Sequence, residues 1–108
     1  MDKTQYLLYS QQAGVIKAFA HPVRIAILES LRDGPRCVSE IAETVASERS
    51  NVSHHLAVMC RAGILAYHRE GLNVVYRIKT PCVLDFLGCV TKVLKDQVHE
   101  KTRMLQRA

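Results

Sequence analysis

Four cysteines offer the most reactive side chains of this 108-residue chain: Cys37, Cys60, Cys82 and Cys89. A thiolate is the soft ligand that arsenite, zinc and cadmium prefer, and it is also the group that oxidants and reactive sulfur species modify. No two of these cysteines form a CxxC pair, so a zinc finger is not expected. The alternative is that the cysteines have no chemical role and only pack, because free cysteines are commonly small buried hydrophobes.

The positions of the thiols separate them into two groups. Cys82 and Cys89 are seven residues apart in a predicted helix, and therefore on one face about 10 Å apart along the axis. That distance is too long for a shared ion or a disulfide within one helix. In a dimer, either thiol could meet its own copy or a thiol such as Cys37 or Cys60. We predict Cys37, Cys82 and Cys89 as effector residues, whereas Cys60, beside an apolar stripe, is expected to pack inertly.

A second group of polar residues opens a predicted helix. Ser50 is a favourable N-cap, since its hydroxyl can accept from a free first-turn amide. Asn51, Ser53 and His54 follow outside the apolar stripe of Val52, Leu56 and Met59. Asparagine can bond adenine through two atoms, and serine and histidine can reach bases or phosphates. We predict DNA contact at Asn51, Ser53 and His54, with ordinary capping as the alternative. Ser50 is a further candidate for DNA contact, although for this residue we predict capping first.

A basic hairpin is predicted next along the chain. Residues 65–69 and 74–79 are rich in β-formers, and Gly71 lies in the segment between them. Arg69, Asn73 and Arg77 are its predicted DNA contacts. Such a hairpin can follow a phosphate backbone as a wing, although the same charges can simply be a solvated strand face.

The remaining elements are helices. Apolar residues at helical spacing predict helices near 4–20, from 22 to the Asp33-Gly34-Pro35 stop, 38–45, 50–62 and 80–103. A short helix, a four-residue turn and a second helix form a helix-turn-helix. The predicted fold is therefore mainly α with a two-stranded β-hairpin wing, a winged helix-turn-helix in one domain over residues 1–108.

Composition is consistent with a nucleic-acid partner. The formal net charge is +5 and the pI is about 9.2, which favours a polyanion. No apolar run is long enough to span a bilayer, and the N-terminus lacks the apolar region of a signal peptide. We therefore expect a cytoplasmic protein without membrane contact, whose thiols stay reduced.

Several segments together resemble the ArsR/SmtB family of winged-helix repressors; they are residues 19–28, 38–42, 51–56, 62–65, 69–71 and Tyr76-Arg77. The resemblance implies a dimer that represses double-stranded operator DNA and leaves it when an effector binds, commonly a metal or metalloid ion. One familiar site of that family has Cys-Val-Cys where this chain reads Cys37-Val38-Ser39, so one thiol is missing. Another uses carboxylates and histidines of the last helix, a spacing that is not reproduced here by Asp85, Asp96, His99 and Glu100.

A homodimer is also predicted from the last helix. Two adjacent apolar rows run along it, a wider stripe than one terminal helix of a small domain needs. Pairing with a second copy, together with the first helix, would cover it. The predicted interface residues are Leu8, Phe86, Leu87, Val90 and Leu94.

Two other classes of function are possible for a chain of this kind. A small thiol enzyme would need a base beside its cysteine, but neither His54 nor His55 has a neighbouring cysteine in sequence. A protein-interaction module is disfavoured by the basic charge and the polar helix start. We therefore expect no enzymatic activity.

Overall fold

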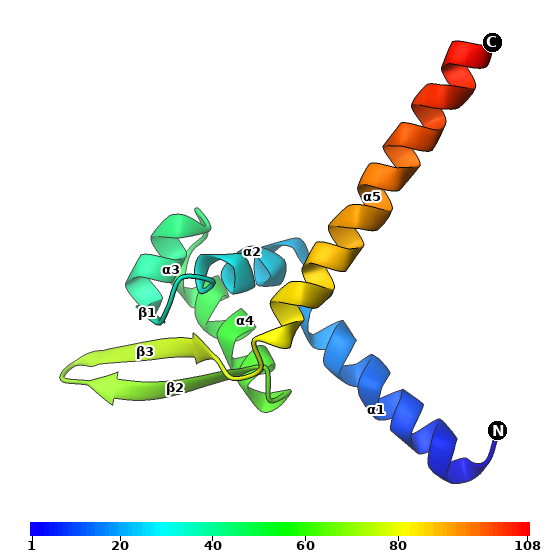
Figure 1. The fold of residues 1–108 in the computed structure, drawn as a ribbon. Helices are drawn as coiled ribbons and strands as arrows, with labels where there is room; N and C mark the ends of the chain where they lie inside the picture. Colours follow the sequence, from blue (N-terminus) through cyan, green and yellow to red (C-terminus); the bar gives the residue numbers. More distant parts are fainter.

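The computed structural model describes all residues from 1 to 108, in five helices and three strands. The helices are α1 (Lys3–Phe19), α2 (Pro22–Ser30), α3 (Val38–Thr44), α4 (Arg49–Arg61) and α5 (Cys82–Arg107). The strands are β1 (Arg36–Cys37), β2 (Leu65–Glu70) and β3 (Asn73–Ile78). Elements α2 to β3 form a body from which α1 and α5 project, and the β2–β3 hairpin extends away from those two helices (Figure 1). The predicted winged helix-turn-helix is confirmed.

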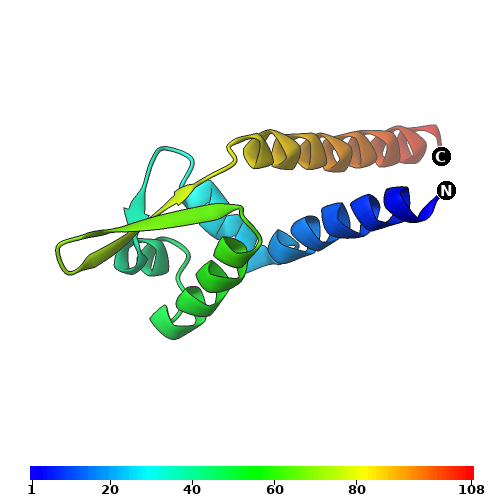
Figure 2. The ribbon, with the colours of Figure 1, turned by 90° about the horizontal axis from the view of Figure 1, so that it is seen from below.

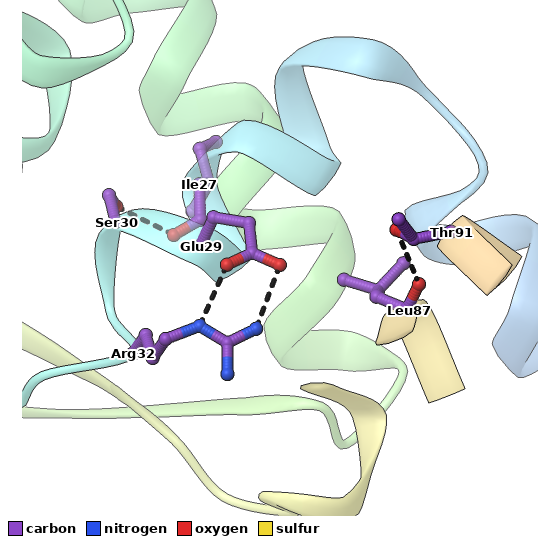
Figure 3. Close-up of polar contacts among 6 residues, drawn as sticks. All are labelled: Ile27, Glu29, Ser30, Arg32, Leu87 and Thr91. Atoms are coloured by element: carbon purple, nitrogen blue, oxygen red, sulfur yellow. Dashed lines mark hydrogen bonds and ion pairs between the residues drawn. The ribbon is translucent and has the colours of Figure 1, made fainter. Parts of the chain in front are cut away.

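Local signals set the ends of α1 and α2. Asp2 and Gln5 cap α1 reciprocally, each side chain bonding the other's backbone N–H, at 2.8 and 3.0 Å. Pro22 opens α2, where the missing N–H costs nothing. At the other end of α2, Ser30 Oγ donates to the carbonyl of Ile27 at 2.6 Å (Figure 3).

Glu29, in the last turn of α2, and Arg32, just after the helix, form a two-bond ion pair at 2.8 and 3.0 Å (Figure 3). Both side chains are about half exposed, so this pair contributes little to stability. The end of α2 is therefore held mainly by the apolar residues beneath it.

The body closes a core of its own. Its fully buried members come from α2, α3 and α4: Ile27, Leu28, Ile41, Val52, Leu56 and Met59. Phe19, Ile64, Leu65, Val83 and Leu87 join the same cluster from the flanking elements. The predicted inner stripe of α4 is confirmed, because Val52, Leu56 and Met59 are all 0% exposed.

The sheet has one more strand than the sequence pattern predicted. β1 pairs antiparallel with β3, placing Arg36 opposite Tyr76 and Cys37 opposite Val75, and the strand order is β1-β3-β2. The predicted hairpin is present as β2 and β3, but β1 was not predicted, since two residues are too few to show alternation. The turn is as expected: Gly71 has φ +61°, a left-handed conformation that glycine adopts without strain.

Two helix boundaries also differ from prediction. Glu48 is the N-cap of α4, without a side-chain capping bond, and Arg49 is the first helical residue. The prediction that Ser50 caps this helix is therefore wrong. Helix α5 continues to Arg107 instead of ending near Arg103, because its last turns contain no glycine or proline to stop it.

Helices α1 and α5 leave much apolar surface uncovered. The views of Figures 1 and 2 show both helices projecting from the same side of the body. Most of the chain's exposed large hydrophobic residues lie on them, among them Leu8 at 51%, Phe86 at 43%, Val90 at 41% and Leu94 at 57%. Leu87 differs: it is only 8% exposed within the core of its own chain. This burial favours packing within its own chain, because Leu87 lies at the base of α5, where that helix still packs on the body; its contact with a second copy stays a prediction.

None of the helices combines the length and the apolar character that crossing a membrane requires.

Candidate nucleic-acid interface and thiol sites

Helix α4 presents a polar stripe opposite its buried one. Spacings of four, three and four residues place Ser50, His54, Ala57 and Arg61 on the same side of the helix, and all are exposed. Asn51 and Ser53 are also exposed and flank this stripe on opposite sides. The inner residues fix the rotation of the helix, so the outer ones face solvent in a defined direction.

The start of α4 suits an anionic ligand. Its first-turn amides carry partial positive charge, and the only acidic side chain at this end is that of the exposed N-cap, Glu48. Arg49 adds an exposed positive charge at the same place. Since Glu48 is the N-cap, the Ser50 hydroxyl is not consumed by capping. Ser50 and Arg49 can therefore both reach a phosphate that lies at this helix end.

The hairpin separates the two arginines that were predicted to act together. Arg69 pairs with Val74 and Arg77 pairs with Ala66, so alternation puts their side chains on opposite faces. Arg69 is exposed near the tip of the hairpin, as is Asn73. The tip therefore offers one arginine and one amide on the outer end of the wing.

Arg77 lies nearer the base and has neighbours of its own. Its Nη1 is 3.5 Å from His68 Nδ1, and His68 Nε2 is 2.9 Å from a carboxylate oxygen of Glu70. Arg77 also lines a cavity of about 380 Å³ with Asp33 and Pro35. Its guanidinium is thus less free than that of Arg69 to contact a phosphate.

Sequence reasoning passed over two exposed residues at this surface. Arg49 was expected in the turn before the helix; its positive charge beside a helix start was the available signal. Leu72 is fully exposed at the hairpin tip, between Gly71 and Asn73. An apolar side chain in a two-residue turn is a signal that could have marked it.

Cys37 lies at the junction of the sheet and the helix-turn-helix. It is half-buried, belongs to β1 and is the N-cap of α3. Its backbone N–H donates to Glu40 Oε1 at 3.0 Å, and hydrogen bonds to Cys37 lower the pKa of that carboxyl. A ligand on this thiol would therefore act directly at the start of α3.

The other three cysteines have different environments. Cys82 and Cys89 are exposed on α5, whereas Cys60 packs against the core, where burial raises the pKa of its thiol. Cys82 also lines an apolar cavity of about 390 Å³ formed with Ile16, Phe19 and Phe86. No group of three or more His, Cys, Asp or Glu side chains in the chain is placed to hold a metal ion. All four cysteines are free.

A body that anchors a helix by its inner stripe, presents that helix's polar side and extends a basic hairpin defines a winged helix-turn-helix DNA-binding regulator. The model of the bacterial regulatory protein arsR family matches residues 21–67. The chain is 37% identical over 100 residues to the HTH-type transcriptional regulator Rv0081 of Mycobacterium tuberculosis, covering 92% of this chain and 88% of the relative. The chain therefore belongs to the ArsR family, whose proteins are DNA-binding transcriptional regulators and not enzymes.

Solved structures agree with this assignment. The crystal structure of Rv0081 matches 88% of this chain and 96% of its own, with a TM-score of 0.77 and 38% identity. A solution structure of a homodimeric winged helix-turn-helix domain of Mb0332 from Mycobacterium bovis matches 93% of both chains, with a TM-score of 0.79 and 28% identity. The antimony-specific transcriptional repressor AntR matches 92% of this chain and 90% of its own, with a TM-score of 0.76 and 28% identity.

Proposed function

We propose that this protein is a homodimeric repressor that reads double-stranded operator DNA with α4. In this proposal Asn51, Ser53 and His54 contact base edges in the major groove, and Ser50 contacts the backbone at the helix start. The observation that carries it is the geometry of α4, whose buried stripe fixes which polar side chains face outward. The whole chain acts as one domain.

The wing holds the backbone beside the reading helix. Arg69 and Asn73 are the stronger candidates for phosphate contact, because both are exposed near the tip, with their side chains on opposite faces of the hairpin. Arg77 serves this role less directly, since His68 and the cavity wall are near its guanidinium. Such contacts position a protein on DNA without reading its sequence.

A second copy of the chain is the proposed cover for α1 and α5. Leu8, Phe86, Val90 and Leu94 are all exposed to an extent unusual for a stable monomer. The homodimeric state of the Mycobacterium bovis domain supports the same assembly. A two-fold dimer would present two α4 helices to half-sites about one DNA turn, roughly 34 Å, apart.

Release from the operator is proposed to involve the exposed thiols Cys82 and Cys89, with help from Cys37. The ligand class is a thiophilic ion such as arsenite, zinc or cadmium; the antimony specificity of AntR is consistent with that class. Because one chain holds no cluster of three metal-binding groups, such a site would need donors from both subunits. There are two alternatives to a thiophilic ion. Reactive sulfur or oxidants could act on the same thiols, or the regulator could have no thiol effector.

A DNA titration tests the proposal. The protein's own promoter and random DNA of equal length are titrated at low and near-physiological salt. We expect the promoter to bind more tightly than random DNA. Both affinities should fall steeply with salt, because Lys and Arg side chains that neutralise phosphates release the counterions of the DNA. Equal affinity for the two DNAs would contradict sequence reading. Repeating the titration with arsenite, zinc, cadmium and a persulfide donor then identifies the effector class.

A further inference from the structure

One arginine links three helices at the elbow between α1 and α2. Arg24 Nη1 donates to the carbonyl of Ala18, near the end of α1, at 3.1 Å. Arg24 Nε donates to Nδ1 of His55, in the middle of α4, at 2.9 Å. Both bonds are partly buried. The guanidinium therefore fastens the proposed reading helix to the helix that projects toward a second subunit.

The charged or titratable side chains that act on His55 are all basic. From the elbow it faces Arg24 and His21, whose ring centroid is 4.7 Å from its own. From α4 it faces His54, at 5.9 Å between centroids. No carboxylate is among the groups that act on it, and burial together with these neighbours lowers the pKa of His55. Its neutral form is therefore favoured in the folded protein.

We propose that the Arg24–His55 hydrogen bond holds α4 in the orientation that reads DNA, and that a proton on His55 releases it. A neutral imidazole accepts the Arg24 N–H through Nδ1. A protonated imidazole has only donors, and a guanidinium has no acceptor, so the bond cannot survive. Protonation also places two cations in contact. Arg24 is in this sense a positioning residue and need not touch DNA.

The link acts on residues that the proposed function assigns to DNA, and the inference rests on that assignment. Asn51 lies one turn before His55 on the same side of α4, and His54 is its immediate neighbour. A tilt of the helix about its buried stripe would move Asn51 and His54 relative to the bases. Contacts that read bases are sensitive to such a shift, whereas phosphate attraction is less so. The measurable quantity is therefore the ratio of promoter affinity to random-DNA affinity.

Variants separate the link from the general charge of the protein. His55→Asn keeps an acceptor oxygen near the position of Nδ1 but cannot take up a proton. Arg24→Lys keeps the charge but lacks the planar fork that donates to Ala18 and His55 together. His99→Asn is the matched control, because it removes an exposed histidine on α5, away from the elbow.

The experiment measures the affinity ratio at about pH 7.5 and about pH 4.5; the lower value lies well below the usual histidine pKa, because the pKa of His55 is lowered. With helix content checked by circular dichroism, the wild type and His99→Asn should lose about tenfold in the ratio at the lower pH, the value of one charge-assisted bond. His55→Asn should lose clearly less than the wild type, because any fall that remains comes from other groups such as His54, and Arg24→Lys should have a low ratio at both. A wild-type ratio that does not change with pH, or a fall equal in His55→Asn, would overturn the proposal.

A measurement without DNA keeps this inference distinct from DNA reading itself. In the free protein, the Nε–H resonance of Arg24 should be protected at the higher pH and lost as His55 titrates. If that resonance changes but the affinity ratio does not, the coupling is wrong, although Asn51 and His54 can still read DNA. If Asn51→Ala and His54→Ala both leave the ratio unchanged at the higher pH, the proposed reading by α4 fails instead.

Discussion

The body of the protein and its two projecting helices satisfy their apolar residues in different ways. In the body, every large side chain of the α4 inner stripe is fully buried within one chain. On α1 and the outer part of α5, side chains of similar type remain exposed, as Leu94 does at 57%. The difference indicates which apolar residues stabilise the fold and which await a partner.

The change from one condition to the other occurs along α5 itself. Val83 and Leu87 are buried against the body, whereas Val90, Leu94 and Val98 are increasingly exposed. All five lie at helical spacing on one stripe, so sequence periodicity cannot tell them apart. Substitutions at Leu87 and Leu94 can distinguish the buried part of the stripe from the exposed part.

Among the predicted substitutions, Leu87→Asp should have the largest effect, and it should act on the stability of the fold. A carboxylate at this buried position has no cationic partner, and an uncompensated buried charge costs about 3–5 kcal/mol. We expect the free energy of unfolding, measured by urea denaturation, to fall by that amount or the protein to be unfolded. A variant as stable as wild type would show that the base of α5 does not pack on the body.

Leu94→Asp should act on assembly and leave the fold of the body intact. Its side chain is exposed in the single chain, so a carboxylate there is hydrated until a second copy covers it. We expect sedimentation to show dissociation at micromolar concentration while the far-ultraviolet spectrum keeps its helical shape. An unchanged dimer, or a wild type that is already a monomer, would contradict the proposed pairing of α1 and α5.

Substitution at the polar side of α4 should leave both stability and assembly unchanged. Asn51→Ala and His54→Ala should each reduce discrimination between promoter and random DNA by about 1–3 kcal/mol if the side chain contacts a base edge. Competition binding measures this directly, and Gln106→Ala, an exposed polar residue near the end of α5, is the control. Full promoter preference in both variants would exclude α4 as the reading helix.

The sequence predicted the helix-turn-helix well because its signals are local and strong. Proline in the first turn of α2 and apolar residues at helical spacing in α4 predict those elements without knowledge of their neighbours. The hairpin was predicted for the same reason, from two β-rich segments around Gly71. These features depend on a few residues each, and the fold satisfied all of them.

Other features depended on partners that periodicity does not contain. The two-residue strand β1 exists only because β3 lies beside it. Helix α4 begins at Arg49, with Glu48 as its N-cap, although Ser50 is by type the better capping residue. The opposite faces of Arg69 and Arg77 follow from strand register, and the burial of Leu87 follows from where α5 leaves the body. The link of Arg24 to His55 joins residues 31 positions apart, which spacing alone cannot suggest.

A smaller effect is expected at the wing. Arg69→Ala should weaken promoter and random DNA to a similar extent and reduce the slope of log affinity against log salt by about 1, the value of one phosphate contact. Lys101→Ala removes the same charge from exposed α5 and should change the slope less. A loss confined to the promoter would mean that Arg69 reads bases, contrary to its proposed role.

The smallest expected effects on DNA binding are those of the cysteines, because in the absence of an effector each Cys→Ser variant should bind like wild type. Their difference should appear in reactivity. Burial raises the pKa of the Cys60 thiol, so less of the reactive thiolate is present near neutral pH, whereas Cys82 and Cys89 are exposed. A thiol-specific reagent should therefore modify Cys82 and Cys89 first and Cys60 last, with mass spectrometry identifying the sites.

Release from promoter DNA by thiophilic ions or oxidants should be lost in Cys82→Ser or Cys89→Ser and retained in Cys60→Ser. If both α5 variants respond like wild type, the thiols of α5 do not sense the effector, and their role is limited to packing between subunits.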